Sequence, residues 1–206
     1  MVQSDVIKSR QAEMVERAIE QARDIAGRVA VVTGGARGLG RAMSEGLLKA
    51  GAKVAVADKS WDGADDLRQQ LISSGRGLAV ELDVTNDAQL DSAYDAVIGE
   101  FGTTDVLINN AALVSETLFY PTGRVKTLDT KDSDWETMFR VNVFGVVKAI
   151  RRFIRPMIEQ GRGSILNVVS SGVLPVAGGG GWFGLRPWTV EMPYQATKAA
   201  VMALTF

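Results

Sequence analysis

The sequence has 206 residues, 46% of them hydrophobic, and a formal net charge of −1 from 23 basic and 24 acidic residues. This length suits one domain with a sizeable core, and the charges form no basic stripe, which argues against a nucleic-acid partner. The chain has no cysteine and no histidine, so disulfides, zinc held by thiolate or imidazole, and histidine-based triads are excluded. Tyr, Lys, Asp, Glu or Ser must carry any proton chemistry, and no metal site is expected.

The N-terminal region predicts a helix ahead of the domain. Residues 1–26 contain neither Gly nor Pro, and apolar residues recur at helical spacing at Ile7, Met14, Ala18, Ala22 and Ile25. This amphipathic extension either packs on the domain or binds a partner or a membrane surface. The sequence shows no secretion signal and no run of about 18 apolar residues. We therefore expect a cytoplasmic protein without a membrane partner.

From residue 27 onward, short β-branched runs alternate with longer helical patterns, which is typical of βαβ units and a parallel sheet. The runs are apolar throughout, as expected for strands covered by helices on both faces. Right-handed crossovers then predict a doubly wound, Rossmann-like α/β fold for residues 27–206. The predicted strands are Arg28–Thr33, Lys53–Asp58, Gly77–Asp83, Asp105–Asn109 and Gly163–Ser170, and the predicted helices are Leu39–Ala50, Ala64–Ser74, Asp87–Phe101 and Asp134–Gln160.

A glycine-rich turn joins the first predicted strand to the first predicted helix, with the sequence Thr33-Gly34-Gly35-Ala36-Arg37-Gly38-Leu39-Gly40. Glycines let backbone N–H groups approach a pyrophosphate, and the positive end of the helix dipole favours phosphate there. The turn is not a Walker A loop, because Arg41-Ala42 stand where Lys and Ser or Thr are needed. Taken alone, the pattern also fits a tight βα turn without a ligand.

The second predicted strand ends at Asp58, 18 residues after Gly40. A carboxylate at this place can accept hydrogen bonds from the adenosine ribose hydroxyls, and it repels a 2′-phosphate. NAD is therefore the expected cofactor, and NADP is less favoured. Arg37 and Lys59 are the two cations that could neutralise a 2′-phosphate instead.

The motif Thr33-Gly34-xxx-Gly38-x-Gly40 resembles the glycine motif of the single-domain branch of the short-chain dehydrogenase/reductase family. Further residues resemble the other motifs of this family and follow in the family's order. They are Asp83-Val84, Asn109-Asn110-Ala111, Asn142, Ser171 and Tyr194-Gln195-Ala196-Thr197-Lys198. The resemblance covers about residue 27 to the last residue. It implies a cofactor site formed by Gly34, Arg37, Gly38, Leu39, Gly40, Asp58, Asp83, Val84, Asn110, Ala111, Tyr194 and Lys198. Within that site, Asp83-Val84 would contact adenine and Asn110-Ala111 would pass beside its ribose.

Tyr194 and Lys198 are the expected proton-handling pair. Residues four apart on a helix share a face, and a cation near a phenol, whose unperturbed pKa is about 10, favours the phenolate. Tyr194 can then act as general base toward an alcohol or as general acid toward a ketone. The resemblance implies that Lys198 also holds the nicotinamide ribose, that Ser171 stabilises the substrate oxygen, and that Asn142 holds a water in a proton relay.

These residues predict an oxidoreductase that interconverts a secondary alcohol and a ketone by hydride transfer with NAD(H). The alternative is a catalytically idle NAD-binding module, or an inactive fragment that acts through assembly. The intact set of Asn142, Ser171, Tyr194 and Lys198 favours the enzyme. The resemblance also implies a homo-oligomer, dimer or tetramer, joined through the helix Asp134–Gln160 and the helix that starts at Tyr194.

The sequence departs from the family pattern at one residue, in two long segments and at its end. Ala112 replaces a usual glycine, and the segments Leu113–Asp134 and Pro175–Pro193 are longer than usual. The second segment joins four glycines, Gly178–Gly181, to Trp182, Phe183 and Trp188, and it is either a substrate lid, a surface excursion or an oligomer contact. The sequence also ends eight residues after Lys198. Five of the family's usual seven strands are therefore expected, with one sheet edge and one wall of the active site incomplete.

Overall fold

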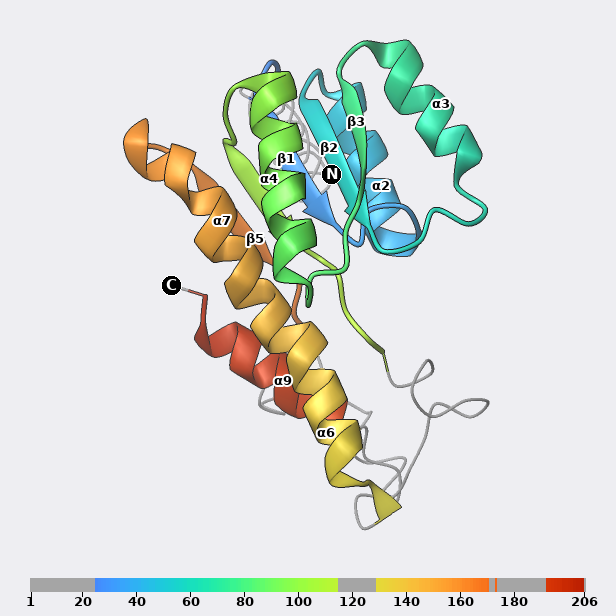
Figure 1. Cartoon of the computed structure of the whole chain (residues 1–206), viewed down its shortest axis with the longest axis vertical. Coiled ribbons are helices and arrows are strands. Elements are labelled where there is room, and N and C mark those ends of the chain that lie inside the picture. Colours follow the sequence, from blue (N-terminus) through green and yellow to red (C-terminus); the bar gives the residue numbers. More distant parts are fainter. Residues whose placement is uncertain (1–24, 115–128, 171–172, 174–191, 206) are drawn as a thin grey trace, which may run out of the picture.

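The computed structural model describes residues 25–114, 129–170, 173 and 192–205. In them, a five-stranded parallel sheet has the order β3-β2-β1-β4-β5 (Figure 1). Its strands are β1 (Val29–Thr33), β2 (Lys53–Asp58), β3 (Gly77–Glu81), β4 (Val106–Asn109) and β5 (Ser164–Asn167). The chain starts at the sheet centre, runs outward to β3 and then returns to the other side of β1, which is the order of a doubly wound sheet. The predicted Rossmann-like α/β fold is thus confirmed.

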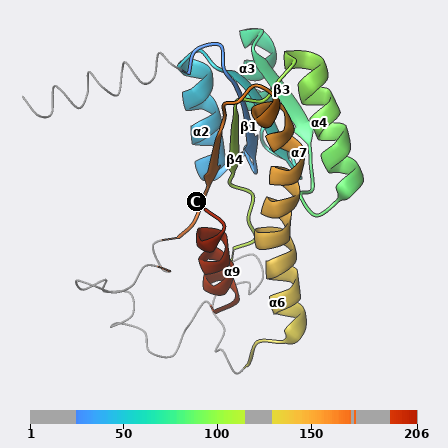
Figure 2. The same cartoon turned by 90° about the vertical axis from the view of Figure 1, so that its left-hand side faces the viewer.

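Helices cover both faces of the sheet, and the alternation of side chains along β1 shows how. Val29 and Val31 face α4 (Asp87–Phe101) and α7 (Gly145–Glu159), where they join a core around Phe153. Val32 faces the opposite way, toward α2 (Gly38–Lys49) and α3 (Asp65–Ser74). In Figure 2 the sheet lies between α2 on one side and α4 and α7 on the other. Both faces of the strand are buried, as the uniformly apolar sequence predicts.

The two ends of α4 are set by local signals that are visible in the sequence. The Asn86 side chain accepts a hydrogen bond from the Gln89 backbone N–H at 3.2 Å and caps the first turn. Gly102 follows the last turn with φ +80°, a left-handed conformation that stops a helix and favours glycine. The predicted bounds Asp87–Phe101 are therefore confirmed. The strands β3 and β5 are shorter than predicted, because their last residues leave the sheet ladder.

The predicted helix Asp134–Gln160 proves to be three segments in line. It begins as α6 (Asp132–Phe139), widens into a π-helical turn, η2 (Arg140–Phe144), and continues as α7. π-turns inside helices often occur at functional sites. The predicted helix at Tyr194 is present as α9 (Met192–Ala203), and it packs against α6 and η2 (Figures 1 and 2).

The predicted N-terminal helix falls mainly on residues 1–24, which lie outside the described residues. The described part of that segment, residues 25–27, forms a turn that leads into β1. Among the helices that the structure describes, none is long and apolar enough to cross a bilayer.

Candidate active site

The glycine turn between β1 and α2 is packed too tightly for side chains at Gly34, Gly35 and Gly40. A Cβ on Gly40 would lie 2.1 Å from the Gly34 carbonyl oxygen, and one on Gly34 would lie 2.7 Å from the Ala111 Cα atom. Gly38 differs, because a Cβ there would meet no atom within 4 Å, although its φ of +53° favours glycine. The turn thus brings bare backbone to an open surface at the first turn of α2.

The N-terminus of α2 has the features that a phosphate group requires. Arg37 occupies the N-cap position with extended backbone but makes no side-chain cap, and the first turn has no acidic residue. Leu39 in this turn is 61% exposed. The first N–H groups of a helix lack partners within it and carry partial positive charge. The turn and this helix end therefore fit the pyrophosphate of a dinucleotide.

Asn110 and Thr33 hold the turn against the end of β4. The Asn110 Nδ2 atom donates to the Gly34 carbonyl at 2.8 Å and to the Thr33 carbonyl at 3.2 Å. The Thr33 Oγ1 atom accepts from the backbone N–H groups of Asn110 and Ala111 at 3.1 and 3.2 Å. The predicted site residues Asn110 and Ala111 thus lie beside the glycine turn. Thr33 was part of the predicted motif, but its bracing role was missed because it depends on this tertiary contact.

Asp58 lies at the end of β2 with 7% of its surface exposed. Its carboxylate accepts hydrogen bonds from the backbone N–H of Ala36 at 3.0 Å and of Ser60 at 3.2 Å. Arg37 Nη2 lies 3.8 Å from Asp58 Oδ1 and donates to the Ser60 carbonyl at 2.9 Å. The carboxylate and the guanidinium thus stand side by side next to the glycine turn.

Asp83 and Val84 follow β3 on the same edge of the sheet. Asp83 pairs with Lys59 at 2.8 Å and accepts from the Thr85 N–H and hydroxyl. Burial raises the pKa of Asp83, but the hydrogen bonds from Lys59 and Thr85 outweigh it, so the pKa is lowered. The Val84 side chain is only 7% exposed and packs on Gly145. This side chain belongs to the core, so the half-buried Asp83 is the more accessible member of the predicted adenine pair.

Tyr194 and Lys198 lie in α9, beside the segment that follows β5. The Lys198 side chain is buried and donates from Nζ to the Val168 carbonyl at 2.7 Å. Its Nζ lies 5.8 Å from the centre of the half-buried Tyr194 ring. Burial lowers the pKa of the Lys198 ammonium below its ordinary value. The predicted pair is therefore brought together at the carboxyl ends of the strands, as the i, i+4 spacing requires.

Asn142 lies in η2 with no exposed surface. Its Oδ1 accepts from the Leu113 N–H at 2.7 Å, and its Nδ2 donates to the Leu113 carbonyl at 2.9 Å and to Thr197 Oγ1 at 3.0 Å. The side chain therefore joins three chain segments. Its predicted role in holding a water stays a prediction. Thr197 was missed from the sequence, although its place between Tyr194 and Lys198 was the available signal.

Some predicted features fall outside the described residues. Ser171, the predicted oxygen-stabilising serine, is one of them, and most of the two long segments is another. The nearest described neighbour of Ser171 is Ser170, whose carbonyl accepts from the Val173 N–H at 3.2 Å. No cluster of three or more Asp or Glu that could hold a metal ion occurs within the described ranges.

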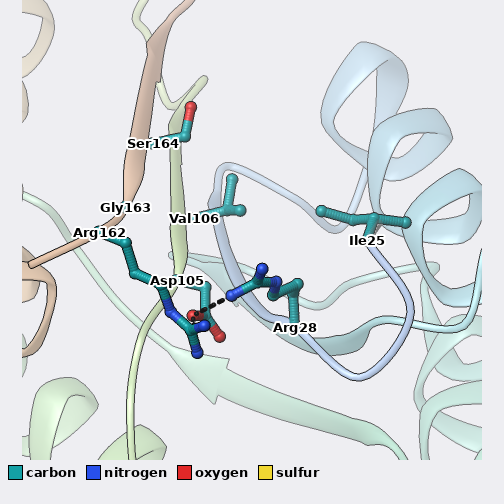
Figure 3. Close-up of a pocket in the computed structure, with 7 residues that line it drawn as sticks. All are labelled: Ile25, Arg28, Asp105, Val106, Arg162, Gly163 and Ser164. Carbon is teal, nitrogen blue, oxygen red and sulfur yellow. Dashed lines mark hydrogen bonds and ion pairs between the residues drawn. The ribbon is translucent and has the colours of Figure 1, made fainter. Parts of the chain in front are cut away.

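A cavity of about 240 Å³ lies at the opposite, amino-terminal edge of the sheet (Figure 3). Arg28 and Arg162 point toward Asp105 there, with their nitrogens 3.4 and 3.7 Å from Asp105 Oδ1. Asp105 also accepts from the Val29 N–H at 2.9 Å. These contacts join the beginnings of β1 and β4 to Arg162, which lies just before β5. Dinucleotides bind at the carboxyl ends of such strands, so this cavity is not the candidate active site.

Comparisons with known proteins agree with the geometry. A model of the short chain dehydrogenase family matches residues 28–206. Fluoren-9-ol dehydrogenase of Terrabacter sp. (strain DBF63) is 69% identical over 202 residues, which cover 98% of this chain and 57% of that protein. The chain belongs to the short-chain dehydrogenase family, and the resemblance drawn from the motifs is confirmed.

Two solved structures resemble this chain with 30% sequence identity, and each match covers 87% of this chain. A short chain dehydrogenase/reductase from Burkholderia phymatum in complex with NAD has a TM-score of 0.69. A gluconate 5-dehydrogenase from Burkholderia cenocepacia J2315 in complex with NADP and tartrate has a TM-score of 0.70. The chain spans 58% and 63% of those two chains, and thus a little under two thirds of the proteins it matches.

Proposed function

We propose that the protein oxidises a secondary alcohol to a ketone, and catalyses the reverse reaction, with NAD(H). The observation that carries this proposal is the placement of Tyr194 and buried Lys198 on one helix, 5.8 Å apart from Nζ to ring centre. That helix docks at the same edge of the sheet as the glycine turn. Fluoren-9-ol is a secondary alcohol on a flat aromatic framework, and the 69% identity to a fluoren-9-ol dehydrogenase supports this substrate class.

Different residues of the chain bind the cofactor, transfer the proton and stabilise the substrate oxygen. The bare turn and the N-terminus of α2 hold the pyrophosphate, and Asp58 accepts hydrogen bonds from the adenosine ribose. When bound, NAD supplies the acceptor for the hydride that leaves the carbinol carbon. Tyr194 takes the hydroxyl proton as the carbonyl forms, and the Lys198 cation favours the phenolate needed for this step. Ser171, by the family resemblance, stabilises the substrate oxygen.

The preference for NAD over NADP rests on Asp58. Its negative charge stands next to the glycine turn and disfavours a 2′-phosphate, whereas Arg37 beside it weakens that discrimination. We therefore expect NAD to be preferred and NADP to be tolerated.

The proposed function is tested with the natural-length protein, fluoren-9-ol and either dinucleotide. Formation of NADH, followed by absorbance, together with fluorenone as product, is the expected result. An idle dinucleotide-binding module would instead bind NAD in a titration without turning over any secondary alcohol of this class. Titration and turnover measured on one preparation therefore separate the two functions.

A further inference from the structure

Thr197 occupies a special position between the two proposed proton-handling residues. Its side chain has no exposed surface. Its Oγ1 atom donates to the Tyr194 carbonyl at 2.6 Å and accepts from Asn142 Nδ2 at 3.0 Å. A single hydroxyl thus connects the turn of α9 that carries Tyr194 to the π-helical turn η2.

The connection continues through Asn142 to the segment after β4. The Asn142 Nδ2 atom donates to the Leu113 carbonyl and to Thr197 Oγ1, and it also lies 3.7 Å from Met138 Sδ, a weak acceptor. Its Oδ1 accepts from the Leu113 N–H. Because the amide is completely buried, loss of the Thr197 hydroxyl would leave its second Nδ2 proton with only the weak sulfur acceptor of Met138 among the described residues. The hydroxyl therefore completes a continuous chain of hydrogen bonds from Leu113 to Tyr194.

We propose that the Thr197 hydroxyl is a positioning group for the reaction, because it fixes the turn that carries Tyr194 against Asn142. This inference rests on the proposed function. The next turn of α9 is held separately, since Val201 packs on Val143 and Val146. Loss of the hydroxyl therefore leaves α9 docked through apolar contacts but lets its first turn shift. A shift of a fraction of an ångström in Tyr194 should lower the rate of proton transfer more than it weakens binding of the substrate or NAD.

The test compares Thr197→Val, which keeps the shape and removes the hydroxyl, with Thr197→Ser, which keeps the hydroxyl. Thr104→Val is the matched control, because Thr104 is also fully buried, its hydroxyl has no hydrogen-bond partner, and it lies before β4 at the far edge of the sheet. All are made in the natural-length protein. The measurements are kcat and KM for fluoren-9-ol, the dissociation constant of NAD and the thermal midpoint.

Thr197→Val is expected to lower kcat by about 10- to 100-fold while KM and NAD binding change by less than about threefold. Thr197→Ser should recover most of kcat, and Thr104→Val should leave it unchanged. A wild-type kcat in Thr197→Val overturns the proposal. An equal loss of kcat in Thr197→Val and Thr197→Ser also overturns it, because the loss could not then come from the hydroxyl. A loss of NAD binding parallel to kcat also overturns it, because general loosening would then explain both.

If Thr197→Val fails to fold, Thr197→Cys replaces it, since a thiol is a much weaker hydrogen-bond partner than a hydroxyl. Its kcat should lie well below that of Thr197→Ser, and equal values would overturn the proposal. Tyr194→Phe, measured in the same assays, distinguishes a failure of the proposed function from a failure of the positioning role of Thr197. If it keeps full activity, the proposed function of the site fails, whereas loss there with full activity in Thr197→Val defeats only the positioning role.

Discussion

Arg37 Nη2 lies 3.8 Å from Asp58 Oδ1, so a cation stands beside the carboxylate that is expected to choose between NAD and NADP. Asp58→Asn removes the charge and keeps an acceptor oxygen for one of the two N–H groups, because Ala36 and Ser60 donate to different oxygens of Asp58. The ratio of the dissociation constants of NADP and NAD should fall by about 5- to 30-fold, because a charge repulsion of about 1–2 kcal/mol is lost. Isothermal titration of both dinucleotides measures the gap.

Arg37→Ala provides the opposite change at the same place. Removal of the guanidinium leaves Asp58 uncompensated, so the gap in favour of NAD should widen. If the unmutated protein prefers NADP, or if both variants move the gap in one direction, the assignment of cofactor choice to this pair is incorrect.

The tight approach at Gly40 predicts a large effect from one methyl group. In Gly40→Ala the new Cβ meets the Gly34 carbonyl at 2.1 Å, so the turn must shift. We expect unfolding free energy to fall by roughly 1–3 kcal/mol and NAD binding to weaken strongly. Gly46→Ala in the same helix is the control, because its Cβ meets no atom within 4 Å. That variant should be about 0.5–1 kcal/mol more stable, from helix propensity, with unchanged NAD binding; equal behaviour of the two variants in urea titrations would contradict this packing.

The Lys59–Asp83 pair predicts a pH-dependent contribution to stability. The pKa of Asp83 is lowered in the folded state, so its contribution is present above the ordinary carboxyl pKa of about 3.9 and is lost as pH falls through the lower folded value. Lys59→Met should therefore destabilise the protein at pH 6, by at most about 1 kcal/mol because the Lys59 side chain is exposed to solvent. The difference should shrink below about pH 4. Unfolding at several pH values measures it, and a difference independent of both pH and salt would exclude an ionic origin.

Exposed apolar side chains on α7 and its neighbours support the predicted homo-oligomer. Phe144 just before α7 is 57% exposed, and Ile158 near its end is 69% exposed. We expect the natural-length protein to be a dimer or tetramer and Phe144→Glu to weaken association by at least about 10-fold, since a charge would be buried in an apolar contact. Ile72→Glu on α3, where Ile72 is also 69% exposed, is the control and should not change association. Light scattering that finds a monomer at micromolar concentration would contradict this prediction.

Local signals explain which parts of the fold could be predicted from the sequence. The bounds of α4 depend on a capping Asn86 and a terminating Gly102, both visible in the sequence, and β2 ends at Asp58 as predicted. The π-turn η2 was missed, because apolar spacing over Arg140–Phe144 is compatible with an uninterrupted α-helix. What marks the turn is a backbone hydrogen bond from the Gly145 N–H to the Arg140 carbonyl, which spacing does not encode.

The candidate site shows the same division. The glycine turn, Asp58 and the Tyr194–Lys198 spacing are sequence patterns with a direct physical meaning, so they could be read before the structure. The use of Thr197 and Thr33 depends on partners 55 and more than 70 residues away. Such pairs are decided by how η2 meets α9 and how β1 meets β4, which a single sequence does not reveal.

The most direct test of the account is the turnover of Tyr194→Phe together with its affinity for NAD. The substitution removes the hydroxyl that takes the alcohol proton and leaves the ring, the glycine turn and Asp58 in place. Turnover of fluoren-9-ol should fall by at least about 10²-fold, while the dissociation constant of NAD stays within about twofold. Lys198→Met should lower turnover as well, move the alkaline rise of the rate to higher pH because the cation beside the phenol is gone, and also weaken NAD binding. A Tyr194→Phe enzyme that keeps most of its oxidation rate would contradict the central claim, because the proton would then leave by another group.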